Sequence, residues 1–285
     1  MRQGQRALLP ALLMSRIPVF FRYIEWICLL VVCVLYFVLD FTLRPFERQF
    51  AVSDLNISHP YAEHEQIPTE YLGIIGILGP IVVIFCVAAW KRSPVLARQA
   101  SLGLLYSTML TGLLVTLTKN AVGRPRPDFL DRCKPLSSAP TNKLVTVAIC
   151  TTDQKNKRLL DGMRSFPSGH TSFSFSGLGY LALFLAAQLK LNSRFSAGWK
   201  FVIPVIPLAL AGWVGLTRSQ DYRHHKEDIV VGGLFGMLMA FAVYRQYFPS
   251  IGKTDSDVTY AEFMPSESSS IRSNTDNLSH AEAMV

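Results

Sequence analysis

Uncharged stretches about as long as a lipid bilayer is thick recur along this chain and restrict the folds open to it. About twenty consecutive apolar residues form an α-helix that crosses the hydrocarbon core. Five stretches without a charged residue reach or approach this length, at 71–90, 100–118, 171–189, 201–217 and 229–244. Because backbone polar groups inside a bilayer must be hydrogen-bonded within the chain, these stretches predict membrane-spanning helices.

A sixth stretch, at 23–41, is also apolar, although Glu25 and Asp40 interrupt it near its ends. Hydrophobic residues make up 50% of the whole chain even without glycine, which is high for a soluble domain. We therefore expect an all-α integral membrane domain over residues 23–248, built as a bundle of six transmembrane helices.

The distribution of charge predicts how this bundle lies in the membrane. Residues 1–22 and the short turns at 91–98 and 190–200 together hold ten Lys and Arg and no Asp or Glu. Short basic segments stay on the cytoplasmic side, so we expect the basic N-terminal tail and both turns there. Six crossings return residues 249–285 to the same side, where their acidic, Ser-rich composition predicts a disordered tail. The net charge of +8 is thus explained by membrane orientation and does not indicate nucleic-acid binding.

Two long loops, at about 42–70 and 120–165, are expected on the lumenal or extracellular side. The first is more acidic than basic and contains a glycosylation sequon at Asn56, which can be modified only in the lumen. The second is more basic than acidic, against the charge rule, and we expect this because its face binds an anion. Cys133 and Cys150 both fall in the second loop, and a lumenal position would allow a disulfide bond between them.

The sequence Ser-Phe-Pro-Ser-Gly-His at 165–170 stands directly before the uncharged run at 171–189. Pro167 suits the start of a helix, and Ser168 is a favoured N-cap residue. The first N–H groups of such a helix have no partner within it, and together with the helix dipole they form a site for an anion such as phosphate. His170 adds a titratable imidazole. Seen alone, this pattern is more often a plain helix cap.

Two further polar clusters lie next to the neighbouring apolar runs. The first, Lys-Asn-Ala-Val-Gly-Arg-Pro-Arg-Pro at 119–127, supplies an ammonium and guanidinium groups, which bind phosphate oxygens. The second, at 218–228, contains His224 and Asp228, which would share one helical face if the last helix begins near here. Such a carboxylate fixes the imidazole tautomer and leaves the other ring nitrogen as a nucleophile. Singly, these clusters are also explained as a positive membrane flank and a surface His–Asp cap pair.

Counting helices brings the three clusters to one membrane surface. One loop joins the end of the third helix to the start of the fourth, and the fourth and fifth helices cross and return. Imidazoles, a carboxylate, a helix N-terminus and several cations suit phosphoryl transfer through a phosphohistidine, in which fixed cations neutralise the phosphate oxygens. A metal site at His224, His225 and Asp228 is the competing interpretation, but it lacks a carboxylate cluster, and neighbouring Lys and Arg repel divalent ions.

In this arrangement the chain resembles the type 2 phosphatidic acid phosphatase (lipid phosphate phosphatase) superfamily. The residues that carry the resemblance are Lys119-(six residues)-Arg126-Pro127, Pro167-Ser168-Gly169-His170 and Arg218-(five residues)-His224-(three residues)-Asp228. It covers roughly residues 20–248. One departure is Thr217, where the family usually has Ser before the arginine.

The resemblance implies a role for each matching residue. His224 would attack phosphorus, Asp228 would orient His224, and His170 would protonate the leaving group. The residues that would hold the phosphate are Lys119, Arg126, Ser168, Gly169 through its backbone, and Arg218. The active site would lie at the lumenal or extracellular ends of the third to sixth helices.

Further sequences are similar to the fungal-type diacylglycerol pyrophosphate phosphatases. They are Pro45-Phe-Glu-Arg-Gln-Phe, Ile57-Ser-His-Pro-Tyr, Arg126-Pro-Asp-Phe-Leu-Asp-Arg-Cys133, Cys150-Thr-Thr and Asp221-Tyr-Arg-His-His. That group needs no Mg²⁺ and also acts on phosphatidate and lysophosphatidate, so the resemblance implies membrane phospholipid substrates and neither a cofactor nor an obligate metal.

Two other functions use the same residues. A phosphotransferase would move the phosphate to an alcohol, and a phospholipid-binding membrane protein would keep the pocket without turnover. Relatives of the second kind usually lose the nucleophilic His or the first-motif Lys, both of which are present here as His224 and Lys119. We expect a multi-pass protein of the endomembrane system (vacuole, Golgi or endoplasmic reticulum) or plasma membrane; the sequence indicates no protein partner.

Overall fold

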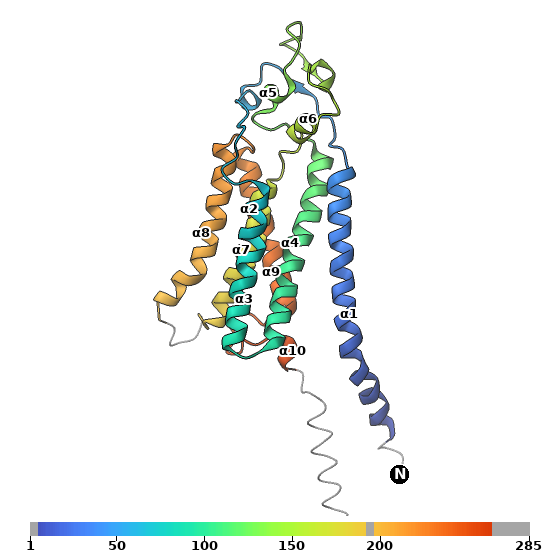
Figure 1. Ribbon diagram of the computed structural model, residues 1–285, viewed down its shortest axis with the longest axis vertical. Coiled ribbons are helices and arrows are strands. Elements are labelled where there is room, and N and C mark those ends of the chain that lie inside the picture. Colours follow the sequence, from blue (N-terminus) through green and yellow to red (C-terminus); the bar gives the residue numbers. More distant parts are fainter. Residues whose placement is uncertain (1–4, 192–196, 264–285) are drawn as a thin grey trace, which may run out of the picture.

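The computed structural model describes residues 5–191 and 197–263 of the chain, and these are mostly helical (Figure 1). Long helical segments lie side by side along the longest axis of the molecule. They are α1 (Gln5–Thr42), α2 (Thr69–Gly73) continuing through the π-helical η2 (Ile74–Leu78) into α3 (Gly79–Trp90), α4 (Pro94–Val122), α7 (Gly169–Gln188), α8 (Trp199–Gln220) and α9 (Lys226–Tyr247).

Five helical segments of the described residues are long and apolar enough to cross a membrane. They are Tyr23–Thr42, Thr69–Trp90, Pro94–Val122, Trp199–Gln220 and Lys226–Tyr247. Their outward side chains are large and apolar; Leu30, Phe85, Trp213 and Leu234 are all exposed, as expected where lipid is the solvent. The prediction of a mostly helical chain with several membrane-spanning helices is confirmed.

Helix α7, which corresponds to the predicted span at 171–189, does not meet the same measure of apolarity. It lies in the interior of the bundle and contacts α4, α8 and α9 (Figure 1). Its Ser172, Ser174 and Ser176 side chains are fully buried and hydrogen-bonded to backbone carbonyls of their own helix. Small polar residues suit such a position because α7 faces other helices rather than lipid.

Two glycines allow this central helix to approach its neighbours. A Cβ at Gly177 would lie only 2.1 Å from the carbonyl oxygen of Gly76 in η2, and one at Gly236 of α9 would lie 2.2 Å from that of Ser172. Neither backbone atom can move aside easily, so glycine is required on both faces of α7. Farther along, aromatic rings from α7 and α9, including Tyr180, Phe184 and Tyr244, form a buried core with α3 and α4.

The two long loops fold together into a cap over one end of the bundle (Figure 1). Strand β1 (Phe50–Ala51) pairs antiparallel with β2 (Leu144–Val145), and η1 (Leu55–Ile57), η3 (Val147–Ile149), α5 (Phe129–Cys133) and α6 (Lys157–Gly162) complete the cap. Phe50, Phe129, Leu159 and Met163 form its apolar core. Cys133 and Cys150, the pair considered from the sequence, are joined by a disulfide bond within it. Asn56 is exposed on this cap.

The opposite end of the bundle differs from the expectation for the C-terminal tail. Disorder is predicted from residue 249 onward, but the described part, up to residue 263, packs against the helix ends and forms α10 (Tyr260–Phe263). The Asp257 carboxylate lies 2.8 Å from Nζ of Lys91 and 3.0 Å from Nζ of Lys190. These ion pairs join the segment to both basic turns, a long-range contact that composition does not reveal. Residues 264–285 lie outside the described residues, as do residues 1–4; helix α1 already begins at Gln5, within the predicted basic tail.

Candidate active site

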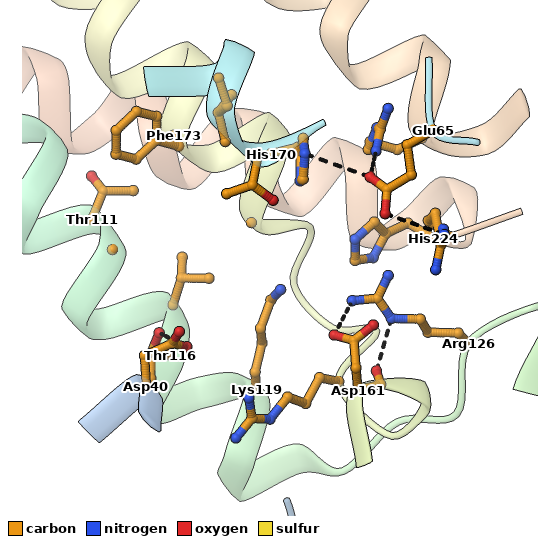
Figure 2. Close-up of a pocket in the computed structure, with 18 of the residues that line it drawn as sticks. Asp40, Glu65, Thr111, Thr116, Lys119, Arg126, Asp161, His170, Phe173 and His224 are labelled. Atoms are coloured by element: carbon orange, nitrogen blue, oxygen red, sulfur yellow. Dashed lines mark hydrogen bonds and ion pairs between the residues drawn. The ribbon is translucent and has the colours of Figure 1, made fainter. Parts of the chain in front are cut away.

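A cavity of about 350 Å³ opens beneath the cap, where the ends of α4 and α7 meet the loop between α8 and α9. Six predicted site residues line it, namely Lys119, Arg126, Gly169, His170, Arg218 and His224. Figure 2 shows the imidazoles of His170 and His224 at one side of this cavity, with Lys119 and Arg126 reaching toward them. The three polar clusters of the sequence therefore meet in one place.

The N-terminus of α7 forms one wall of the cavity. Ser168 is the N-cap, and its Oγ accepts a hydrogen bond from the backbone N–H of Thr171 at 3.5 Å. A Cβ on Gly169 would lie 3.0 Å from Nζ of Lys119, so the ammonium group sits directly at the first turn of the helix. The Lys119 ammonium group makes no hydrogen bond or ion pair with any described residue. An unpaired cation beside free backbone N–H groups is a favourable site for a phosphate.

Arg126 is buried at the opposite wall and is paired with the cap. Its Nη2 lies 2.7 Å from Oδ1 of Asp161, and its Nε donates to the carbonyl oxygen of Asp161 at 2.9 Å. Arg132 holds the second oxygen of the same carboxylate at 2.9 Å. Burial alone would raise the pKa of Asp161, but the charges of Arg126 and Arg132 lower it below its usual range. Asp161 is thus ionised and fixes the direction of the Arg126 guanidinium.

Arg218 lies at the end of α8 with only 1% of its surface exposed. Its Nη1 lies 2.7 Å from Oε2 of Glu65, and its Nη2 lies 2.9 Å from Oδ2 of Asp221. Glu65 comes from the loop between α1 and α2 and also pairs with Arg223, at 3.2 Å. These carboxylates allow a guanidinium to be buried, because an unpaired charge in this position would be strongly destabilising.

The imidazole of His224 is oriented by a backbone carbonyl. Its Nδ1 lies 2.6 Å from the carbonyl oxygen of Ser165, which can only accept a hydrogen bond, so Nδ1 carries the proton. The Nε2 atom is then the nitrogen with a free lone pair. Burial, together with the charges of Arg126 and Lys119, lowers the pKa of His224 well below its usual value, so the ring is neutral at physiological pH.

Asp228 lies close to His224, but not in the way predicted. Helix α9 begins at Lys226, so His224 precedes the helix and does not share a helical face with Asp228; Nδ1 of His224 and Oδ2 of Asp228 are 3.9 Å apart. Asp228 accepts hydrogen bonds from Ser165 Oγ at 2.5 Å, Arg124 Nη1 at 2.6 Å and the His225 backbone N–H at 3.1 Å. The carboxylate therefore holds the two segments that position the His224 ring.

The His170 imidazole belongs to the first turn of α7 and lines the same cavity. Its Nε2 lies 3.1 Å from the carbonyl oxygen of Ile67, which identifies Nε2 as a protonated donor. The Glu65 carboxylate lies 3.9 Å from the same nitrogen (Figure 2). Both rings line the cavity; the Nε2 proton of His170 is donated to Ile67, whereas Nε2 of His224 keeps a free lone pair.

Several residues of the site were not assigned from the sequence. Glu65, Asp161 and Ser165 lie in the two long segments between predicted membrane helices, where no periodic pattern marks them. Arg124 and Arg223 stand beside motif residues without being distinguished from them. The acidic composition of the first loop was the only signal for Glu65. Within residues 5–191 and 197–263 there is no group of three or more His, Cys, Asp or Glu side chains that could hold a metal ion.

The far side of the cavity is less polar and reaches into the bundle. Tyr36 of α1, Leu72 of α2, Val115 of α4 and Phe173 of α7 line it. A phosphate bound near the imidazoles could therefore be esterified to an apolar group. Two imidazoles, a helix N-terminus and fixed cations inside a bundle of membrane-type helices are typical of an integral membrane enzyme of phosphoryl transfer.

Comparisons with known proteins agree with this class. Residues 100–251 match the PAP2 superfamily. The chain is 52% identical over 240 residues to the probable diacylglycerol pyrophosphate phosphatase 1 of Schizosaccharomyces pombe, covering 84% of this chain and 86% of that protein. It is 40% identical over 231 residues to diacylglycerol pyrophosphate phosphatase 1 of Saccharomyces cerevisiae, covering 77% and 80%. Identity to lipid phosphate phosphatase 2 of Arabidopsis thaliana is 36% over 228 residues, covering 79% and 77%.

The chain therefore belongs to the PAP2 superfamily, as its motifs predict. No solved structure matches it.

Proposed function

We propose that this protein is a lipid phosphatase that hydrolyses diacylglycerol pyrophosphate to phosphatidate, and phosphatidate and lysophosphatidate to their alcohols, without a divalent metal. The observation that carries the proposal is the protonation pattern around the cavity. His224 has its proton held on Nδ1 by Ser165 and its lone pair on Nε2, while His170 carries a proton on Nε2. The apolar side of the cavity and the names of the relatives support a lipid substrate.

In the first step, Nε2 of His224 attacks phosphorus while the bond from phosphorus to the leaving oxygen breaks. Lys119, Arg126, Arg218 and the backbone N–H of Gly169 stabilise the charge on the phosphate oxygens, as a metal does in other phosphatases. His170, protonated on both ring nitrogens when the anionic substrate is bound, gives one proton to the leaving oxygen and becomes neutral. Water, deprotonated by His170, then attacks the phosphohistidine, the P–N bond breaks and His224 is regenerated.

We further propose that α7 also crosses the membrane, which brings the number of spanning helices to six, and that the site faces the lumen or the exterior. The disulfide bond of the cap supports this, because such bonds persist in oxidising compartments. The basic turns at the opposite end of the bundle support a cytoplasmic position for that end. The endomembrane system or the plasma membrane would then be the location.

The test is phosphate release by the purified protein in detergent–lipid mixed micelles containing EDTA. Diacylglycerol pyrophosphate, phosphatidate and lysophosphatidate are compared as substrates. We expect turnover of all three substrates. In His224→Ala the rate of phosphate release should fall by about a thousandfold or more, because water attacks phosphorus much more slowly than the imidazole nucleophile does. His64→Ala, in an exposed part of the first loop, is the matched control.

The intermediate distinguishes the mechanism. After reaction with radioactively labelled substrate and rapid quenching with alkali, the wild type and His64→Ala should carry covalently bound phosphate, and His224→Ala should not. This phosphate should be labile in acid and stable in alkali, as expected for a phosphohistidine. Full activity in His224→Ala, or turnover only after a metal is added, would contradict the proposal. Products formed on added alcohols would identify a phosphotransferase, and binding of these lipids without turnover would identify a lipid-binding protein.

A further inference from the structure

Arg223 directly precedes the proposed nucleophile and lines the same cavity, although no motif assigns it a role. Its side chain is almost completely buried, with 3% exposure. Nη2 donates to the carbonyl oxygen of Ala62 at 2.8 Å and lies 3.2 Å from Oε1 of Glu65. Its buried Nε has no hydrogen-bond partner among the described residues. Leaving such a donor unpaired is costly, and a ligand that displaces Glu65 from this guanidinium could supply the missing acceptor.

Glu65 shows where an anion can be held. Oε2 lies 2.7 Å from Nη1 of Arg218 and 3.9 Å from Nε2 of His170, and Oε1 lies 3.2 Å from Nη2 of Arg223. One carboxylate thus bridges two buried guanidinium groups beside the proposed general acid (Figure 2). Guanidinium groups bind carboxylate and phosphate oxygens in the same planar manner. Glu65 is 28% exposed at its side chain and belongs to a loop, whereas both arginines are fixed by burial.

We propose that Arg223, Arg218 and His170 form a second phosphate subsite, which Glu65 occupies in the absence of substrate and yields to the inner phosphate of a diphosphate ester. This inference rests on the proposed function and specifies its substrate. In-line transfer places the leaving group opposite the attacking His224. In the proposed reaction His170 protonates the leaving oxygen, and the Glu65 carboxylate lies 3.9 Å from Nε2 of this ring. The terminal phosphate would occupy the first subsite, at Lys119, Arg126 and the N-terminus of α7, and Arg218 would lie between the two phosphates and contact both.

The second subsite explains selectivity between two lipids that share an acyl portion. A diphosphate ester places a charged phosphate at Arg223, so it gains charge-assisted hydrogen bonds and can displace a carboxylate. A monophosphate ester places only an ester oxygen there and leaves Arg223 paired with Glu65. Arg223 and Glu65 are therefore determinants of the preference for the diphosphate.

The experiment measures kcat/KM for diacylglycerol pyrophosphate and for phosphatidate in one preparation of each variant. Arg223→Gln should lower the value for the diphosphate lipid about tenfold more than that for phosphatidate, the size expected for one charge-assisted hydrogen bond. Lys226→Gln removes an equal charge from an exposed position three residues away and should leave the ratio unchanged. Because both substrates meet the same protein sample, a variant that folds less well loses both activities equally, and the ratio cancels this loss.

Binding of imidodiphosphate, a non-hydrolysable diphosphate, and of inorganic phosphate tests the subsite without turnover. Measured by calorimetry, Arg223→Gln should lower the affinity for imidodiphosphate about tenfold and the affinity for inorganic phosphate only slightly. The affinity of Arg223→Lys for imidodiphosphate should lie between those of Arg223→Gln and the wild type. Glu65→Gln should tighten imidodiphosphate severalfold, while Glu63→Gln, on the same loop, should not.

Equal losses for both lipids in Arg223→Gln, together with unchanged imidodiphosphate binding, would overturn the second subsite. A wild type that binds imidodiphosphate through Arg223 but hydrolyses neither lipid would instead overturn the proposed function and leave the subsite intact.

Discussion

Arg124 and Asp228 form a short ion pair across the candidate site, with 2.6 Å between Nη1 and Oδ1. Arg124 follows α4 and Asp228 lies in the first turn of α9, so the pair ties together two segments that are 104 residues apart in the chain. Through Ser165, the same carboxylate also reaches the segment whose carbonyl orients His224. The proposed nucleophile is therefore positioned by contacts between three loops.

Replacing this carboxylate should reduce the rate of chemistry rather than substrate binding. In Asp228→Asn one oxygen acceptor is lost, Ser165 and Arg124 are held less firmly, and the His224 ring is less well oriented. We expect kcat to fall about a hundredfold with KM changed less than threefold, as for other residues that orient a catalytic imidazole. Steady-state kinetics on phosphatidate check this. The control is Glu227→Gln, which removes only the longer 3.3 Å contact of an exposed carboxylate with Arg124; a similar loss in both variants would contradict the role of Asp228.

The stability of the substrate-free protein should decrease as the medium becomes acidic. The pKa of His224 in the folded protein lies well below its value in the unfolded chain, because of burial and the nearby charges of Arg126 and Lys119. Between these two values the unfolded chain binds a proton that the folded protein does not. The free energy of unfolding therefore falls by up to about 1.4 kcal/mol for each pH unit below about pH 6.5.

Thermal unfolding in detergent, followed from about pH 7.5 to about pH 5, measures this dependence. Because carboxylates contribute their own slope, the informative quantity is the difference between wild type and His224→Gln, whose slope should be shallower. Identical slopes would mean that His224 titrates normally in the folded protein.

The disulfide bond between Cys133 and Cys150 should stabilise the cap. It closes a loop with a sequence separation of 17, for which chain entropy predicts about 3 kcal/mol. Cys133→Ser with Cys150→Ser should therefore lower the unfolding temperature, and dithiothreitol should do the same to the wild type but not to the double variant. Cys86→Ser, an exposed free cysteine on the lipid side of α3, is the control and should behave as the wild type. A wild type indifferent to reduction would contradict this prediction.

The orientation of the cap in the membrane can be read from glycosylation. Asn56 is exposed in η1 of the cap, so a lumenal cap makes it accessible to oligosaccharyl transfer. When the protein is produced in a eukaryotic host, endoglycosidase treatment should increase the mobility of the wild type on a gel. Untreated Asn56→Gln should migrate at the position of the treated wild type. The second sequon, at Asn277, lies outside the described residues and is expected in the cytoplasm, so Asn277→Gln should change nothing. Modification at Asn277 alone would invert the orientation.

Much of the bundle can be predicted from the hydrophobic pattern, because each membrane-spanning segment forms its backbone hydrogen bonds within one helix and must be long and apolar. The central helix α7 departs from this rule: its serines and glycines are buried among other helices, so it is less apolar than the lipid-facing spans. The ordered segment that ends in α10 was likewise missed, since Asp257 meets Lys91 and Lys190 only after the helices have packed.

The sequence by itself determined that Lys119, His170 and His224 share one end of the bundle, because crossing a membrane an even number of times returns the chain to the same side. Only the tertiary structure decided how those residues are held and protonated. The carbonyl oxygen of Ser165, rather than the Asp228 carboxylate, accepts the hydrogen bond from His224 Nδ1, and Glu65 lies between Arg218 and Arg223. These contacts join loops, and the conformation of each loop depends on that of the others. Such packing leaves no repeating pattern in the sequence from which it could be predicted.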